Sequence, residues 1–145
     1  MNAEANTSAP PSSASSESPR SELTIRADDQ PKYDLKEFTV AAGAEVKLTL
    51  QHIGSMPKTT MGHNVVILTM DADPEAFVKA AQQHVNNDYI PPKMSNSIVA
   101  YTDLIGGGQS DTITFTAPEK PGDRTFLCSF PGHYQLGMKG TMHVQ

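Results

Sequence analysis

Residues 128–138, CSFPGHYQLGM, carry three side chains that bind soft metals: the thiol of Cys128, the imidazole of His133 and the thioether of Met138. Cys128 is the only cysteine in the chain, so it has no internal disulfide partner. Thiolate and thioether sulfur select metals such as Cu(I), and imidazole accommodates Cu(II) as well. Two His and one Cys in a trigonal plane, with a weak axial Met, form the blue copper arrangement. The segment therefore predicts three of the four ligands of such a centre.

The second imidazole must come from elsewhere in the chain, and His63 is the best candidate. It opens an apolar run in TTMGHNVVIL and directly follows Gly62. A glycine lets the backbone approach a metal closely, and its carbonyl is a candidate for a fifth, distant ligand. We expect the neighbouring Asn64 to connect the two ligand loops by side-chain hydrogen bonds.

The segment between Cys128 and His133 favours a stiff ligand loop. Pro131 fixes one φ angle and Gly132 permits the turn, while Phe130 is expected to exclude water. A scaffold that holds one geometry for both copper oxidation states lowers the reorganisation that one-electron exchange requires. Four protein ligands leave no open coordination position, so the pattern predicts an electron carrier and not an enzyme.

The elements that must position these residues are mostly short strands. Pro and Gly turns separate alternating or apolar runs at residues 22–27, 36–52, 63–70, 110–118, 124–130 and 139–145. Six or more such strands predict an all-β, antiparallel sandwich.

One inserted helix is predicted at about residues 74–86. Asp73 is its expected N-cap and Pro74 its first residue. The expected buried face holds Phe77, Ala80, Ala81 and His84 or Val85.

The chain divides into two parts by composition. Residues 1–20 are almost entirely Ser, Ala, Pro, Glu and Asn, which predicts a disordered tether, and residues 21–145 are expected to form one copper-binding domain.

No apolar stretch approaches the ~20 residues that span a bilayer, and the N-terminus lacks a signal-peptide pattern, so we expect no membrane insertion. Eleven basic and 16 acidic side chains give a net charge of −5, which argues against a nucleic-acid partner.

Four motifs, MGHN with its apolar strand, LIGGGQSDTITF, CSFPGH and MKGTM, resemble the cupredoxins, the type 1 blue copper proteins, and within them the azurins and auracyanins. The resemblance covers about residues 21–145 and implies a Greek-key β-sandwich with one short inserted helix. It implies one copper per chain, held by the ligands His63, Cys128, His133, axial Met138 and the weak carbonyl donor Gly62. His52 is similar to a buried azurin histidine near the site, whose protonation is linked to redox state.

Three departures separate the sequence from the azurin pattern. The spacing from His133 to Met138 is that of the auracyanins and is one residue longer than in azurins. The azurin disulfide is absent, with Leu23 and Gly43 near its two positions, and a valine at 65 or 66 replaces the core tryptophan. The Ser/Ala/Pro tail resembles the tether of lipid-anchored members, which implies a periplasmic or otherwise extracytoplasmic protein and is compatible with a membrane tether.

Three other functions are alternatives to electron transfer, and each has its own requirement. A copper storage or delivery protein needs a site that releases metal, and a nitrite reductase type of enzyme needs a second, His-rich copper site. A Cys and His pair can also serve as nucleophile and base, although no acidic group that would orient the His is evident. Transient redox partner proteins are expected to dock on a monomer through apolar residues around the ligand loops, and such contacts bury less than ~1,200 Å². These residues are Met56, Pro57, Met61, Pro131, Gly132, Tyr134 and Leu136.

Overall fold

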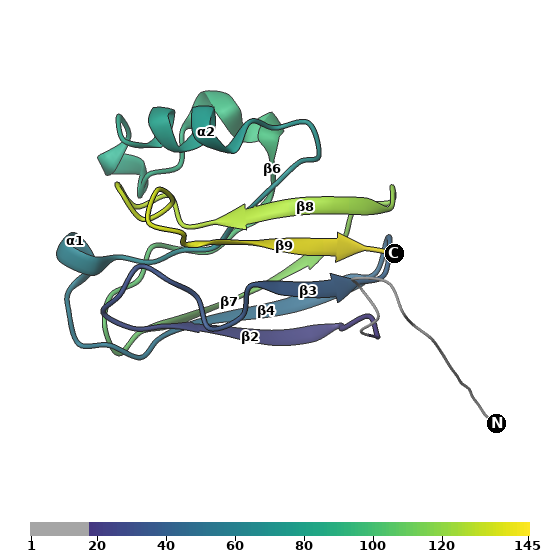
Figure 1. Ribbon diagram of the computed structural model, residues 1–145, viewed down its shortest axis with the longest axis horizontal. Helices are drawn as coiled ribbons and strands as arrows, with labels where there is room; N and C mark the ends of the chain where they lie inside the picture. Colours follow the sequence, from purple (N-terminus) through teal and green to yellow (C-terminus); the bar gives the residue numbers. More distant parts are fainter. Residues whose placement is uncertain (1–17) are drawn as a thin grey trace.

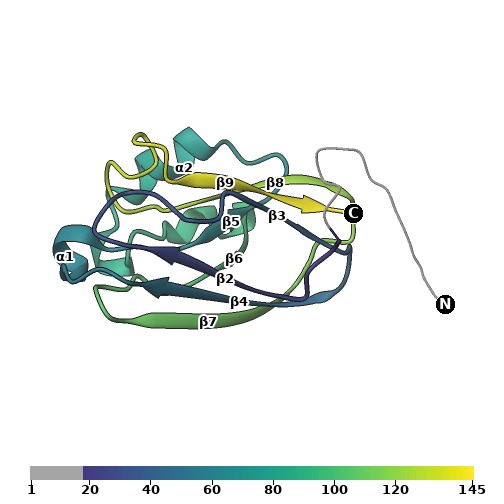
Figure 2. The same ribbon diagram turned by 60° about the horizontal axis from the view of Figure 1, so that its bottom comes forward.

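The computed structural model describes residues 18–145 and forms two packed β-sheets (Figures 1 and 2). The first sheet has the strand order β2-β4-β7 and the second has the order β3-β9-β8-β5-β6. The first contains β2 (Glu22–Ala27), β4 (Glu45–His52) and β7 (Ser110–Thr116). The second contains β3 (Glu37–Val40), β9 (Lys139–Val144), β8 (Gly122–Leu127), β5 (Val66–Leu68) and β6 (Ile98–Tyr101). The β-sandwich prediction is confirmed.

The prediction that all strands pair antiparallel is wrong. β2 pairs with β4 in parallel, and β3 pairs with β9 in parallel. After β2 the chain crosses to the other sheet as β3 and then returns as β4, so β2 and β4 run in the same direction. The alternating pattern of a strand specifies its buried face but not the sheet that it joins.

The core lies between the sheets and extends to the predicted ligands. Along β4 the side chains of Val46, Leu48 and Leu50 are fully buried, while the residues between them face outward or are half-buried. Cys128 and Met138 belong to the same buried cluster as these residues. The ligand loops are therefore packed onto the core and not suspended above it.

The inserted helix α2 (Pro74–Ala81) is shorter than predicted. Asp73 caps it by accepting hydrogen bonds from the main-chain N–H groups of residues 75 and 76, as expected. The helix ends before His84, and Val85 is 58% exposed instead of buried. Asn and Asp side chains compete with helical hydrogen bonds, and Asp88 adopts a left-handed φ of 53°. Short helical segments not predicted from the sequence are α1 (Lys58–Met61) and η2 (Pro92–Ser97), while η1 (Val85–Asn87) begins within the predicted helix.

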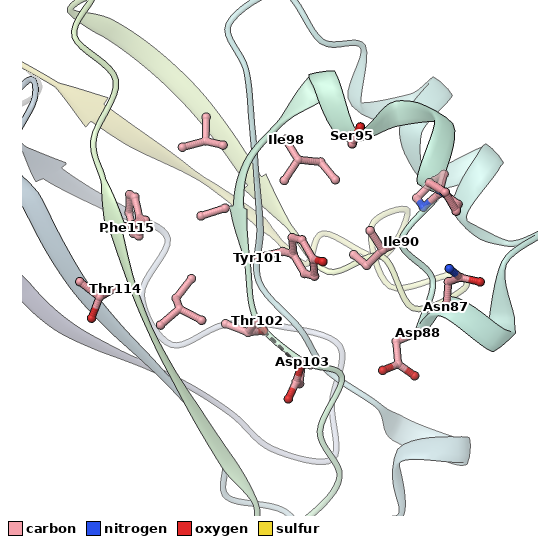
Figure 3. Close-up of a pocket in the computed structure, with 15 residues that line it drawn as sticks. Asn87, Asp88, Ile90, Ser95, Ile98, Tyr101, Thr102, Asp103, Thr114 and Phe115 are labelled. Atoms are coloured by element: carbon pink, nitrogen blue, oxygen red, sulfur yellow. Dashed lines mark hydrogen bonds between the residues drawn. The ribbon is translucent and has the colours of Figure 1, made fainter.

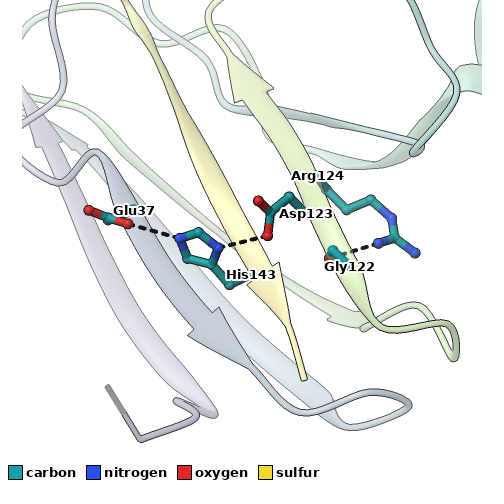
Figure 4. Close-up of polar contacts among 5 residues, drawn as sticks. All are labelled: Glu37, Gly122, Asp123, Arg124 and His143. Atoms are coloured by element: carbon teal, nitrogen blue, oxygen red, sulfur yellow. Dashed lines mark hydrogen bonds and ion pairs between the residues drawn. The ribbon is translucent and has the colours of Figure 1, made fainter. Parts of the chain in front are cut away.

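His143 joins three neighbouring strands of the larger sheet (Figure 4). Its Nε2 atom lies 2.8 Å from the carboxylate of Glu37 on β3, and its Nδ1 atom lies 2.8 Å from that of Asp123 on β8. Burial lowers the pKa of this imidazole, but hydrogen bonds and charges from Glu37 and Asp123 outweigh burial and raise the pKa above its ordinary value. These contacts give His143 a structural role in the larger sheet.

Both described ends of the chain lie away from α1 (Figures 1 and 2). The predicted tether falls mostly on residues 1–17, which lie outside the described residues, and residues 18–20 precede β2 without regular structure. Among residues 18–145, no helix has the length and apolar character needed to cross a membrane.

Candidate metal centre

Three of the predicted ligands meet at one end of the sandwich. Potential ligand atoms of His63, Cys128 and His133 all lie within 4.8 Å of one another, and all three residues are buried. His63 lies between α1 and β5, Cys128 directly follows β8, and His133 lies in the turn before β9. Within residues 18–145 this is the only group of its kind. The fold therefore brings together ligands 65 residues apart in the sequence.

The ring of His63 is oriented with one nitrogen free for a metal. Its Nε2 atom donates to the main-chain oxygen of Asp28 at 2.6 Å. Its Nδ1 atom is buried and has no hydrogen-bond partner in the described part of the chain. Main-chain hydrogen bonds of 3.0 and 2.9 Å with Ile105 also fix its position. A buried nitrogen without a partner is costly, so this orientation fits a metal donor better than a structural histidine.

The sulfur of Cys128 lies between the other expected donors. Its Sγ atom is 3.5 Å from Nδ1 of His133 and 3.8 Å from the carbonyl oxygen of Gly62. A Cβ atom added to Gly62 would lie 2.5 Å from the carbonyl oxygen of Lys58 in α1. Because the φ of Gly62 is −71°, the close approach of α1, not an unusual backbone angle, requires glycine here.

Met138 completes the expected donor set. Its side chain is fully buried in the same cluster as Cys128. Its main-chain oxygen accepts a hydrogen bond from the N–H of Cys128 at 3.2 Å, and its own N–H donates to the oxygen of His133 at 3.0 Å. The loop reverses through Gly132 and Gly137, whose φ angles of 85° and 101° favour glycine.

Asn64 connects the two ligand segments, as the sequence predicted. Its Oδ1 atom accepts a hydrogen bond from the N–H of Ser129, and its Nδ2 atom donates to the hydroxyl of Ser129, both at 2.9 Å. Both residues are buried. Since Asn64 follows His63 and Ser129 follows Cys128, the pair fixes the separation of two expected ligands.

Sequence reasoning missed the loop between β2 and β3. Besides Asp28, which holds His63, the carboxylate of Asp29 accepts hydrogen bonds from the N–H groups of Ser55 and Met56 and from the Ser55 hydroxyl. These hydrogen bonds lower the pKa of Asp29, and the bond from the Ser55 main chain has the largest effect. The only signal in the sequence, ADDQP, indicates a turn but not the segment that it contacts.

His52 lies beside the centre, in agreement with the resemblance. Its ring stacks on that of His63 with 4.5 Å between the ring centroids. Its Nε2 atom donates to the main-chain oxygen of Met61 at 2.8 Å, and its Nδ1 atom accepts from the N–H of Gly54 at 3.1 Å. Through these contacts His52 supports His63 and the α1 segment.

Burial determines the protonation of the donors. It raises the pKa of Cys128 to about 12, although hydrogen bonds from the main chain of Asn64 and Phe130 act in the opposite direction. Burial and the nearby imidazoles of His63 and His52 lower the pKa of His133 to about 4, and burial also lowers the pKa of His63. At neutral pH both imidazoles can offer a lone pair, whereas the thiol must lose a proton to bind a metal.

The chemistry of the donor set fits copper. Two neutral imidazoles, one thiol and one thioether match the His₂Cys set with an axial Met, and Phe130 packs on His133 with 4.6 Å between ring centroids. The sandwich and this centre define a type 1 blue copper protein, a class that transfers single electrons. Residues 20–145 match the copper binding proteins of the plastocyanin/azurin family. The chain belongs to this family, and its centre holds one type 1 copper.

Individual relatives support the same assignment. The chain is 34% identical to azurin from Alcaligenes faecalis over 126 residues, covering 85% of this chain and 97% of that protein. It is 36% identical to outer membrane protein H.8 from Neisseria gonorrhoeae, over 78% of this chain and 62% of that protein. The crystal structure of reduced auracyanin from Roseiflexus castenholzii superposes with a TM-score of 0.74 at 34% identity, covering 88% of this chain and 99% of that one.

Proposed function

We propose that copper would be held by the side chains of His63, Cys128, His133 and Met138, with the Gly62 carbonyl as a further, weak donor. The observation that carries this ligand set is the convergence of three buried donors on one point, with the Nδ1 atom of His63 left without a partner in the described chain. Bound copper supplies the Cu(II)/Cu(I) couple, which exchanges one electron.

The protein contributes rigidity to this exchange. The main-chain pairing of His63 with Ile105 and the Asn64–Ser129 hydrogen bonds hold the donors in one arrangement. A site that does not rearrange between oxidation states has little reorganisation to overcome. Because four protein side chains would occupy the copper coordination positions, none remains for a substrate. We therefore propose an electron carrier that does not turn over a substrate.

Replacing the axial ligand tests this assignment. Met138→Leu should keep the blue colour, because the thiolate remains, but should raise the reduction potential, because Cu(II) loses a weak sulfur donor. Met142→Leu is the matched control, since Met142 is equally buried in the same core cluster. Cyclic voltammetry of both variants should show a shift only for Met138→Leu. Equal reduction potentials in the two variants would mean that Met138 is not a copper ligand.

Burial of the site favours copper retention over storage or delivery. None of the four side chains is more than 5% exposed. Transfer of copper to an acceptor would require an incoming ligand to reach the metal through this packing. Retention predicts that a chelator added to the copper protein removes the metal slowly, over hours. Complete loss within seconds would favour the delivery function.

We propose that redox partners dock on the ligand-loop patch, made of Met56, Pro57, Met61, Pro131, Gly132, Tyr134 and Leu136. Each member is at least partly exposed, and Leu136 is 71% exposed. Figures 1 and 2 place α1 and the loop between β8 and β9 at the same end of the sandwich. His133 is only 5% exposed, so a partner would meet the patch above its ring. A small, transient contact of this kind suits a monomeric carrier.

A charge placed in the patch tests this docking surface. Met61→Lys should slow electron self-exchange by like-charge repulsion between two copies, without altering the visible spectrum. Met70→Lys provides the control, because Met70 is exposed beside Gly122, at the opposite end of β8 from Cys128. Self-exchange measured by NMR line broadening should fall only in the first variant. Equal rates in both variants would argue against the patch.

We further propose that residues 1–20 tether an extracytoplasmic domain of residues 21–145. Residues 18–20 enter the sandwich at the end away from α1, so such a tether would leave the copper end free to meet partners (Figure 1). Similarity to a relative named as an outer membrane protein supports this location. Fractionation of the native cells tests it: the protein should appear outside the cytoplasm, and membrane association that only detergent releases would indicate a lipid anchor.

A further inference from the structure

A cavity of about 740 Å³ opens where the two sheets fail to close, between the edge strands β6 and β7 (Figure 3). η1 and η2 lie along its other side. The volume falls within the range of small-molecule sites in proteins. None of the expected copper ligands lines it, so the cavity is separate from the metal centre.

Most of the wall is apolar. Figure 3 shows the ring of Tyr101 in the middle of the cavity, beside Ile90. Tyr101 is 49% exposed, so about half of its surface is open to a ligand. The other apolar lining residues are Pro91, Pro92, Ile98, Val99, Ala100, Ile113 and Phe115.

One end of the cavity is acidic. Asp88 and Asp103 both lie there, below the Tyr101 ring in Figure 3. The N–H of Asp103 donates to Asp111, but no hydrogen bond or ion pair within residues 18–145 engages the carboxylate of Asp88 or Asp103. The lining contains no Lys, Arg or His. Two unpaired carboxylates beside an apolar wall create a negative potential that nothing in the cavity neutralises.

We propose that this cavity binds an amphipathic organic cation, a small amine with an apolar or aromatic body. The ammonium group lies near Asp88 and Asp103, and the body packs on Tyr101 and the apolar wall. A neutral apolar ligand would leave the carboxylates unused, and an anionic ligand would be repelled by them. The aromatic ring of the half-exposed Tyr101 also attracts a cationic nitrogen.

Binding can be measured by NMR with a matched pair of probes, phenethylamine and 2-phenylethanol. They share the same aromatic body, and only the first carries a charge at pH 7. The reduced copper protein is used at full length, because Cu(I) is diamagnetic. Phenethylamine should shift the amide signals of residues 98–103 to saturation and bind about three- to tenfold more tightly than the alcohol, as expected for exposed ion pairs. Raising the salt to 0.5 M should weaken only the amine.

Variants assign the effect to the acidic end. Asp88→Asn combined with Asp103→Asn should lower the affinity for the amine to that for the alcohol. The control combines Glu45→Gln with Glu119→Gln, which removes the same charge from exposed residues outside the cavity. Equal affinity for the two probes, loss of binding in the control, or no saturable shift at residues 98–103 would each overturn the proposal.

Discussion

Loading the apoprotein with Cu(II) should release one proton per chain at pH 6. This number follows from the protonation of the three expected donors, Cys128, His133 and His63, before copper binds. With a pKa of about 12, the Cys128 thiol is almost wholly protonated, with a thiolate fraction on the order of one in a million. His133, with a pKa of about 4, is neutral at this pH, and burial favours the neutral form of His63 by lowering its pKa. Copper binding therefore displaces the thiol proton and few others.

The proton count should depend on pH in a specific direction. Near pH 4 about half of the His133 rings carry a proton in the apoprotein, so copper binding should release about 1.5 protons or more. The apparent copper affinity should fall accordingly as the pH is lowered from 6 to 4. Above pH 6 the count should stay close to one until the thiol itself titrates.

A pH-stat titration measures this number directly, as base consumed per equivalent of copper in unbuffered solution. Cys128→Ser is the comparison, since a serine hydroxyl keeps its proton and should release none. Zero protons from the unchanged protein would mean that the thiol is already ionised without metal. Two or more protons at pH 6 would mean that the imidazoles are charged. Either result would refute the role assigned to burial.

Two further predictions concern the packing around the centre, and a third concerns His143 in the larger sheet. Asn64→Ala should lower the unfolding free energy of the apoprotein by about 2 to 5 kcal/mol in urea titrations, because two buried groups of Ser129 lose their partner, and a loss below about 1 kcal/mol would contradict this. Gly62→Ala should cost about 1 to 3 kcal/mol in the same assay, through its contact with α1, and should shift the copper charge-transfer band, whereas Gly108→Ala, strained only by its φ and remote in sequence from the expected ligands, should leave the band unchanged. The pKa of His143 is raised in the folded protein, so its stabilisation is complete below the unfolded pKa of about 6.5 and is lost as the pH rises through the folded pKa. The stability difference between the protein and His143→Gln should therefore shrink between pH 6 and pH 9, and a constant difference would exclude this linkage.

Local patterns predicted the site better than the sheet pairing. The residues between Cys128 and Met138 lie in one short loop, so their spacing nearly determines their proximity. His63 followed from its place after Gly62 at the start of an apolar run, and the resemblance implied the same residue. The connection of the two ligand loops by Asn64 followed from the same reasoning, because Asn64 adjoins an expected ligand, whereas its partner Ser129 was identified only in the structure.

Long-range main-chain contacts could not be predicted. The oxygen of Asp28 orients His63 from 35 residues away, and any residue type could supply that carbonyl. The parallel pairing of β2 with β4 depends on a crossover that alternation does not encode. The cavity beside Tyr101 likewise arises from where two sheet edges diverge, which is a property of the packed fold.

The visible and electron paramagnetic resonance spectra of the protein with one equivalent of Cu(II), beside Cys128→Ser, test the central claim most directly. Thiolate coordination in a trigonal site predicts an intense sulfur-to-copper charge-transfer band and a narrow copper hyperfine splitting, both absent from the variant. A colourless protein, or tetragonal copper signals that are the same with Ser at position 128, would contradict the blue copper centre.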